Sequence, residues 1–195
     1  SRKMGYSRLG VAHCPDMAEV ARRVAAFLEG EGFEVVLPRD ADPLGQARHF
    51  AEAGTQMNLL GGMCVAHEAL FIRESQAPAV GLIARDTRLR HNPAAGIYTS
   101  RSYLKSELFG HWKAAERPSY RGGDSHALDE VATEMETASN GARSRLAEAM
   151  DVAHRLGAGH IGVSFCVGFK EEAKILSKLL ETNGFQVSSA CCKTG

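Results

Sequence analysis

The sequence predicts an α/β protein with an open, doubly wound, mostly parallel sheet. Short apolar runs alternate with helix-length segments, which is typical of parallel strands joined by right-handed crossover helices. In addition, residues 8–36 recur without a gap at residues 160–188, a shift of 152 positions. A repeat of this length indicates that one strand–helix–strand unit is used twice.

The two copies of this unit share a cysteine at the end of their first apolar run, Cys14 in the first copy and Cys166 in the second. The other identical pairs are Gly10 and Gly162, Val11 and Val163, Glu19 and Glu171, Ala21 and Ala173, Leu28 and Leu180, Glu29 and Glu181, Gly32 and Gly184, Phe33 and Phe185, and Val35 and Val187. The repeat therefore places two thiols at equivalent positions of the fold.

Residues 1–110 are expected to form a first α/β domain of four strands with helices between them. The expected strands are Leu9–Cys14, Phe33–Leu37, Asn58–Val65 and Ala79–Asp86. Asp16 is expected to cap the first helix, and Asp42 the second, with Pro43 in its first turn. The apolar stripe of the first helix is expected at Val20, Val24, Phe27 and Leu28. Residues 87–103 are expected to be a loop.

A linker is expected at residues 111–123, which include Pro118. Residues 124–195 are then expected to form a helical segment, interrupted near Asn140, followed by the second copy of the strand–helix–strand unit. The chain begins at Ser1 without a methionine and stops at Gly195 directly after an apolar run. This favours a fragment or a processed product of a longer protein.

The composition argues against several classes of protein. Lys plus Arg and Asp plus Glu both number 23, so the chain lacks the basic surface that binds nucleic acid without sequence preference. No apolar run approaches the roughly 20 residues of a membrane span, and no secretory signal is visible. A cytoplasmic location is therefore expected. Glycine-rich nucleotide loops and the serine hydrolase elbow are also missing from the sequence.

The five cysteines make thiol or metal chemistry the leading functional question. An odd number outside a small disulfide scaffold is typical of a reducing compartment. By the expected strands, all five lie at or near the carboxyl ends of strands, where doubly wound proteins bind ligands. Cys14, Cys64 and Cys166 also precede helices, whose free N–H groups stabilise a thiolate. The alternative for each is a small buried hydrophobic residue.

Cys64 and His67 are separated by two residues, a spacing that lets one turn present both side chains to a tetrahedral metal ion. His91 follows the neighbouring strand and is expected to reach the same crevice, where Cys14 would complete the set. Gly62 permits a bound group to approach the backbone closely. The alternative is a packed thiol beside a histidine that caps a helix.

Two adjacent cysteines, Cys191 and Cys192, end the last expected strand. Neighbouring side chains of a strand point to opposite faces, so one of the two is expected to be functional. Cys192 is the candidate because it lies beside Lys193. The first copy has Arg39 and Asp40 at these positions, so it cannot carry the same site in full.

Several segments resemble a prokaryotic family of unknown function whose members are described as metal-binding. Three segments look like the opening of the family's sequence: His160–Cys166, Lys170–Ala173 and Gly184–Lys193. Three others are similar to the family's later motifs: Gly62–Glu68, Leu70–Phe71 and His91–Pro93. The family's usual form of the first later motif is Gly-Leu-Cys-Val-Gly-His-Asp. The resemblance touches most of residues 6–105 and 143–195.

The resemblance implies a cysteine-rich domain that binds a metal or an iron–sulfur centre. By motif, the residues that carry over are Cys64, His67 and His91 from the later part and Cys166 and Cys192 from the opening, with Cys14 at the position of Cys166. The chain departs from the family where a cysteine before Asn-Pro is replaced by Asp42 before Pro43. It is thus similar to one degenerate complete domain followed by the first half of another.

We therefore expect this chain to bind a transition metal (zinc or iron) or an iron–sulfur cluster, in a redox or metal-handling role. Its ligands are expected to act together, between the two parts of the chain or between subunits of a homo-oligomer or protein complex. One alternative is a thiol-dependent enzyme with Cys14 or Cys166 as nucleophile and a nearby histidine as base. Another is a non-catalytic structural subunit of a larger complex.

Overall fold

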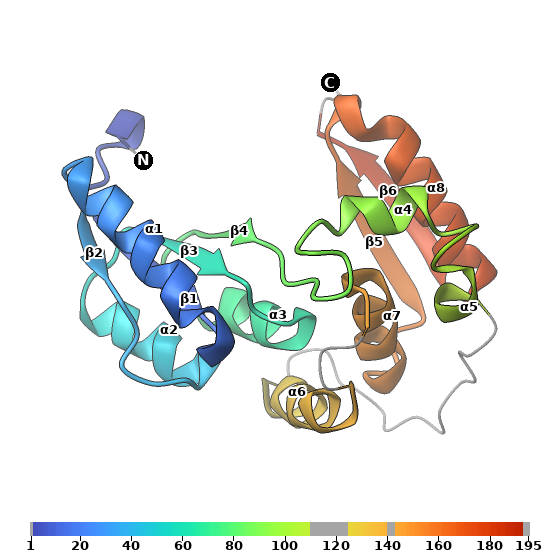
Figure 1. The fold of residues 1–195 in the computed structure, drawn as a ribbon, viewed down its shortest axis with the longest axis horizontal. Helices are drawn as coiled ribbons and strands as arrows, with labels where there is room; N and C mark the ends of the chain where they lie inside the picture. Colours follow the sequence, from blue (N-terminus) through green and yellow to red (C-terminus); the bar gives the residue numbers. More distant parts are fainter. Residues whose placement is uncertain (1, 110–124, 140–142, 193–195) are drawn as a thin grey trace.

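The computed structural model describes residues 2–109, 125–139 and 143–192 and shows two lobes, each built on a parallel sheet (Figure 1). The first lobe holds a four-stranded sheet and the second a two-stranded sheet, and all strand pairs in them are parallel. The predicted α/β class with parallel strands is confirmed. The expected linker at 111–123 and the interruption near Asn140 lie outside the described residues.

The first sheet has the strand order β2-β1-β3-β4. Its strands are β1 (Arg8–His13), β2 (Glu34–Val36), β3 (Met57–Gly61) and β4 (Ala79–Ile83). The chain runs from β1 to one side and then returns past it to β3, so the direction of winding reverses between β1 and β3. In doubly wound proteins this switch point opens the crevice that binds ligands.

Three helices cover this sheet: α1 (Ala18–Gly30), α2 (Pro43–Glu52) and α3 (Val65–Glu74). Asp42 caps α2 as predicted, because its carboxylate accepts a hydrogen bond from the N–H of Gly45 at 2.7 Å. The expectation for Asp16 was wrong. A 3₁₀ turn precedes α1, and the Asp16 carboxylate lies 3.3 Å from the guanidinium of Arg85 instead.

The apolar stripe predicted for α1 is displaced around the helix. Phe27 is 69% exposed, whereas Ala21 and Ala25 are buried against the sheet. Small side chains let the helix lie close to the strands, which turns Phe27 toward solvent. The third and fourth strands also end earlier than predicted. Gly62, with a positive φ of 80°, ends the extended backbone of β3.

The second lobe contains β5 (His160–Phe165), a 3₁₀ turn (Val167–Phe169), α8 (Lys170–Thr182) and β6 (Gln186–Cys191). Two further helices, α5 (Lys105–Leu108) and α7 (Arg145–Arg155), pack against this unit. A short helix, α4 (Ala94–Tyr98), lies in the segment expected to be a loop. The buried core of the lobe is formed by Leu104, Leu108, Ala147, Met150, Val163, Ala173, Leu179, Leu180 and Phe185.

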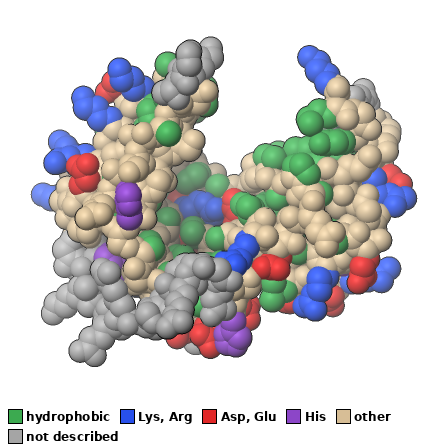
Figure 2. All heavy atoms as spheres, turned by 180° about the vertical axis from the view of Figure 1, so that it is seen from behind, with side chains coloured by type: hydrophobic (Ala, Val, Ile, Leu, Met, Phe, Trp, Pro, Cys, Tyr) green, Lys and Arg blue, Asp and Glu red, His purple; other side chains and the backbone are tan. Residues whose placement is uncertain are grey.

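The two lobes meet through α3, α6 (Ser125–Ser139) and α7. A hydrophobic cluster joins them and consists of Cys64, Ala66, Leu70, Leu128, Val131, Ala132, Met135, Val152 and Leu156. Above this junction the lobes diverge, and Figure 2 shows a hollow between them. Within the described ranges, no helix combines the length and the apolar character that a membrane span requires.

The repeated units have the same order of strand, 3₁₀ turn, helix and strand, but their surroundings differ. A Cβ atom on Gly10 would lie 2.3 Å from Oδ1 of Asn58 and 2.8 Å from the ring of Phe50. A Cβ atom on the equivalent Gly162 would meet nothing within 4 Å. The first copy is therefore enclosed by α2 and β3, whereas the equivalent face of the second copy is open.

Candidate functional site

Two exposed thiols, Cys166 and Cys192, come together at the carboxyl edge of the second sheet. Cys166 directly follows β5, and Cys192 directly follows β6. The N–H of Cys192 donates to the carbonyl oxygen of Phe165 at 2.9 Å, which extends the parallel ladder by one step and brings the two thiol groups into contact. Cys191 lies one step earlier and is half-buried, so Cys192 is the member of the adjacent pair that reaches Cys166.

The surroundings of Cys166 favour its thiolate. The N–H of Gly168 and the thiol of Cys192, in that order of effect, lower the pKa of Cys166 below its ordinary value, with a further contribution from the N–H of Val167. These N–H groups belong to the turn that leads into α8, where backbone donors have no partner within the helix. A lowered thiol pKa increases both nucleophilicity at neutral pH and affinity for metals.

A second pair of cysteines lies at the switch point of the first sheet, and both are buried. Cys14 follows β1 and is 3% exposed, and Cys64 lies just beyond β3 and is 6% exposed. Cys64 caps α3, and its Sγ atom accepts from the N–H of His67 at 3.5 Å. The Cys-x-x-His spacing therefore serves, at least in part, to begin a helix.

Arg85, which follows β4, lies close to both buried thiols. Burial lowers the pKa of its guanidinium, but Asp16, Cys14 and Cys64 act in the opposite direction and the net effect is a raised pKa. The cation is thus held firmly in its charged form at the switch point.

The other predicted site residues have local partners. His91 is exposed and adopts a left-handed φ of 61°. Its Nδ1 atom accepts from the N–H of Asp86 at 3.3 Å, and its own N–H donates to the Asp86 carbonyl at 2.7 Å. At Gly62, a Cβ atom would lie 2.6 Å from the side chain of Met17. The close approach predicted at this glycine is thus made by Met17.

Sequence reasoning missed the side chains that α7 inserts at the carboxyl edge of the first sheet. Arg145 donates to the carbonyl of Met63 at 3.0 Å and forms an ion pair with Glu68. Its backbone N–H donates to a carboxylate oxygen of Asp86 at 3.0 Å. Charged residues at positions 145 and 148, three apart and therefore on one face of the helix, were the available signal.

Glu148 lies one turn after Arg145 and is buried beside the start of α3. Burial raises the pKa of its carboxyl group, although Arg85, Arg145 and the N–H of Val65 act against that shift. Arg145 and Glu148 thus both lie at the carboxyl edge of the first sheet, next to the residues that follow β3. The thiols at this switch point are therefore enclosed, whereas those of the second sheet are open.

The six predicted metal ligands lie in three separate places: Cys166 with Cys192, Cys14 with Cys64 and His67, and His91 beside Asp86. Across the residues for which positions are described, no three His, Cys, Asp or Glu side chains form a group that could hold a metal ion. Each thiol pair thus offers at most part of a four-ligand metal site. The open pair has two soft donors and room for more ligands.

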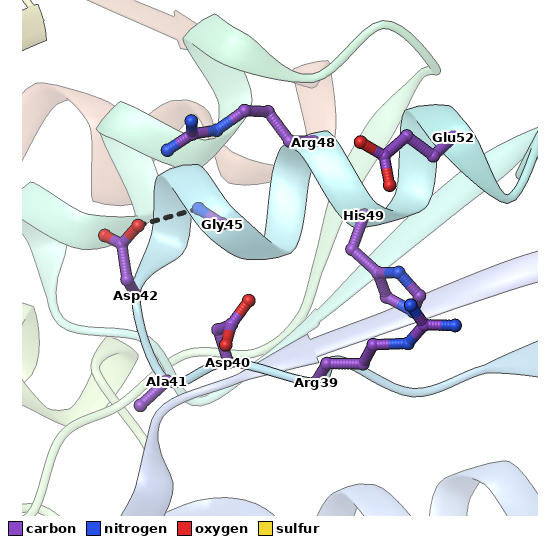
Figure 3. A pocket seen from close by; sticks show the side chains of 8 residues that line it. All are labelled: Arg39, Asp40, Ala41, Asp42, Gly45, Arg48, His49 and Glu52. Carbon is purple, nitrogen blue, oxygen red and sulfur yellow. Dashed lines mark hydrogen bonds between the residues drawn. The ribbon is translucent and has the colours of Figure 1, made fainter.

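A charged pocket of about 580 Å³ lies where β2 leads into α2 (Figure 3). It is lined by Arg39, Asp40, Ala41, Asp42, Gly45, Arg48, His49 and Glu52. Asp40 occupies the position that Cys192 has in the second copy. The pocket therefore marks where the first copy has a carboxylate and an arginine in place of the adjacent thiols.

A family model described as "Protein of unknown function (DUF1847)" matches residues 36–82 and 106–195. The chain belongs to this family. The DUF1847 match includes the second copy of the repeated unit and leaves out residues 1–35, which contain most of the first copy. This agrees with a degenerate first domain, in which Asp40 stands at the position that Cys192 has in the second copy.

The chain is also similar to the uncharacterized protein MJ0455 of Methanocaldococcus jannaschii, with 34% identity over 130 residues. The alignment covers 55% of this chain and 66% of that relative, slightly less than two thirds of its length. No solved structure matches the chain. The similarities thus establish the family, and the chemistry has to be inferred from the geometry of the site.

Proposed function

We propose that this DUF1847 protein binds a transition-metal ion or an iron–sulfur centre through Cys166 and Cys192. The contact between the two exposed thiols at the open edge of β5 and β6 carries the proposal. Two neighbouring thiolates are a donor set that zinc, copper(I) and iron favour. The N–H groups that lower the pKa of Cys166 assist, because a metal binds the thiolate and displaces the thiol proton.

A dithiol supplies two of the four ligands of a tetrahedral centre. The remaining ligands come, in this proposal, from a second subunit, or from bridging sulfide where the centre is an iron–sulfur cluster. Such sharing agrees with the expected homo-oligomer. It also assigns different roles to the two lobes: the second lobe binds the metal, and the enclosed thiols of the first lobe support the fold.

Cobalt(II) titration of the reduced, metal-free chain tests this assignment, because thiolate ligation of cobalt produces charge-transfer absorption. We expect that absorption in the native chain and its loss in Cys166→Ser and Cys192→Ser. Cys191→Ser is the matched control, since it removes the neighbouring thiol, which is not among the groups that lower the pKa of Cys166. An equal signal in all three variants would rule out the dithiol as the binding group.

One observation favours thiol–disulfide exchange as a second candidate function: a thiolate-favouring Cys166 has a second thiol in direct contact. Attack of the Cys166 thiolate on an external disulfide would form a mixed disulfide and release one thiolate. The Cys192 thiol would lose its proton to solvent and attack the mixed disulfide at the sulfur of Cys166. The external half of the mixed disulfide would leave as the second thiolate. The chain would retain an internal disulfide, which mass spectrometry detects as a loss of two hydrogens.

A further inference from the structure

Each sheet has two outer strands in the described part of the chain, and β4 and β5 are among them. β4 pairs with β3 alone, and β5 pairs with β6 alone. An unpaired edge presents a row of N–H and C=O groups that readily pair with another strand, and proteins usually cover or blunt it. A two-stranded sheet is also below the usual size, so β5 and β6 would gain from a further strand.

The edge formed by β4 is apolar as well as unpaired. Val80 is 46% exposed and Leu82 is 51% exposed, and Gly81 between them is exposed too. Figure 2 shows hydrophobic side chains gathered along the first lobe's side of the hollow. No charged side chain or proline interrupts the strand. This edge therefore lacks the features that protect against pairing.

The first copy of the repeat shows which kind of strand is expected beside the unpaired edge of β5. In the first copy, β1 is flanked on that side by β3, with residues Leu9 to His13 paired to Met57 to Gly61. The same side of β5 is empty among the described residues, and a side chain at Gly162 would meet no atom within 4 Å. The second copy thus retains a strand-binding edge without the strand.

We propose that β4 of one chain pairs in parallel with β5 of a second copy of this chain. The result is a continuous sheet of order β2-β1-β3-β4-β5-β6, in which the last two strands belong to the partner. The crossover from β5 to β6 then runs in the same direction as that from β3 to β4, so right-handed connections place α8 on the same face as α3. This is the ordinary arrangement of a doubly wound sheet.

A second copy is required because β5 is held away from β4 of its own chain. Its lobe is tied to α3 through α7, by the bonds of Arg145 to Met63 and Glu68 and by the hydrophobic cluster at the junction. Each chain offers one β4 edge and one β5 edge, so reciprocal pairing closes a dimer with two equivalent contacts. The docking surface does not depend on the proposed metal centre.

Sedimentation equilibrium of the reduced, metal-free chain tests the proposal, together with a Leu82→Lys variant. We expect a dimer whose dissociation constant rises at least about tenfold in Leu82→Lys, because a charge on the apolar edge opposes pairing. Phe27→Lys is the matched control, since Phe27 is an exposed apolar residue on α1, which packs against β1 and β2 away from β4, and its replacement should leave the dimer intact. A monomer at every concentration, or equal dissociation constants in all three proteins, would overturn the proposal.

Hydrogen exchange locates the contact independently of any variant. Amides of residues 79–83 and 160–165 should gain protection as the protein concentration rises. Residues 34–36 of β2, the opposite edge of the first sheet, serve as the internal control and should not change. A dimer that protects β2 while leaving β4 and β5 unchanged would contradict this pairing.

Discussion

Cys166 and Cys192 follow two different strands, yet their thiol groups are in contact at the open edge of the second sheet. Parallel pairing produces this contact, because β5 and β6 end side by side and one further backbone hydrogen bond aligns the residues beyond them. The equivalent positions in the first copy are Cys14 and Asp40. The repeat is therefore symmetric in its fold and asymmetric in its thiol chemistry.

Alkylation of the metal-free, reduced protein should be fastest at Cys166. The pKa of this thiol is lowered by the N–H of Gly168 and by Cys192, so the rate should reach half its maximum at a pH below that of an ordinary thiol, about 8.5. Mass spectrometry after timed labelling with iodoacetamide gives the rate at each pH. Cys192→Ser should shift the midpoint toward the ordinary value.

The buried thiols provide the control for this experiment. Cys14 and Cys64 are almost fully buried and should react far more slowly in the folded protein. In urea all cysteines should label at similar rates. Preferential labelling of Cys14 in the folded state would favour that residue as the nucleophile and contradict the assignment to the second lobe.

The two equivalent glycines should respond differently to the same substitution. Gly10→Ala places a methyl group against Asn58 and Phe50, which are both fully buried, and should lower the free energy of unfolding by about 2 kcal/mol. Gly162→Ala enters open space and should change it by less than about 0.5 kcal/mol. Urea unfolding of both variants measures the difference. Equal losses would mean that the second copy is enclosed as the first is.

The fold was largely predictable from sequence because its signals are local. Apolar runs and helix caps such as Asp42 establish the order of strands and helices, and the repeat establishes the second unit. The order of the strands within each sheet was not predictable, because it depends on which strands pair at long range. Phe27 shows the same limit on a smaller scale: small residues on the neighbouring face, not hydrophobicity alone, decided which side of α1 was buried.

The candidate site was predictable only in part. The cysteine pattern indicated the sheet edges, and Cys192, expected to be the functional member of the adjacent pair, is the thiol that lies beside Cys166. The enclosure of Cys14 and Cys64 was not visible, because it depends on Arg145 and on the burial of a carboxylate from a distant helix. A sequence motif gives only the spacing of its own residues. It does not show which side chains from distant parts of the chain pack against them.

Glu148 should make stability depend on pH. Burial raises the pKa of its carboxyl group above the ordinary 4.5. Between pH 4.5 and the raised pKa, the folded state therefore binds more protons than the unfolded state. Its contribution to stability is complete below 4.5 and is lost as the pH rises through the folded-state pKa. Glu148→Gln cannot ionise, so its stability relative to the native chain should increase across that range.

Urea unfolding at a series of pH values checks this prediction. Glu29→Gln is the matched control, because it makes the same replacement at an exposed residue of α1. Parallel profiles for the native chain and Glu148→Gln would show that the carboxyl group is not held in a protonation-favouring environment. An increase confined to Glu148→Gln would support its burial against α3.

The metal content of the chain purified without air tests the central assignment most directly. Elemental analysis should be made on the native protein and on Cys166→Ser, Cys192→Ser and Cys64→Ser. We predict stoichiometric zinc or iron in the native protein and in Cys64→Ser, and its loss in both variants of the second-lobe pair. Metal retained in Cys166→Ser and Cys192→Ser, or no metal in the native protein even after reconstitution, would contradict the account.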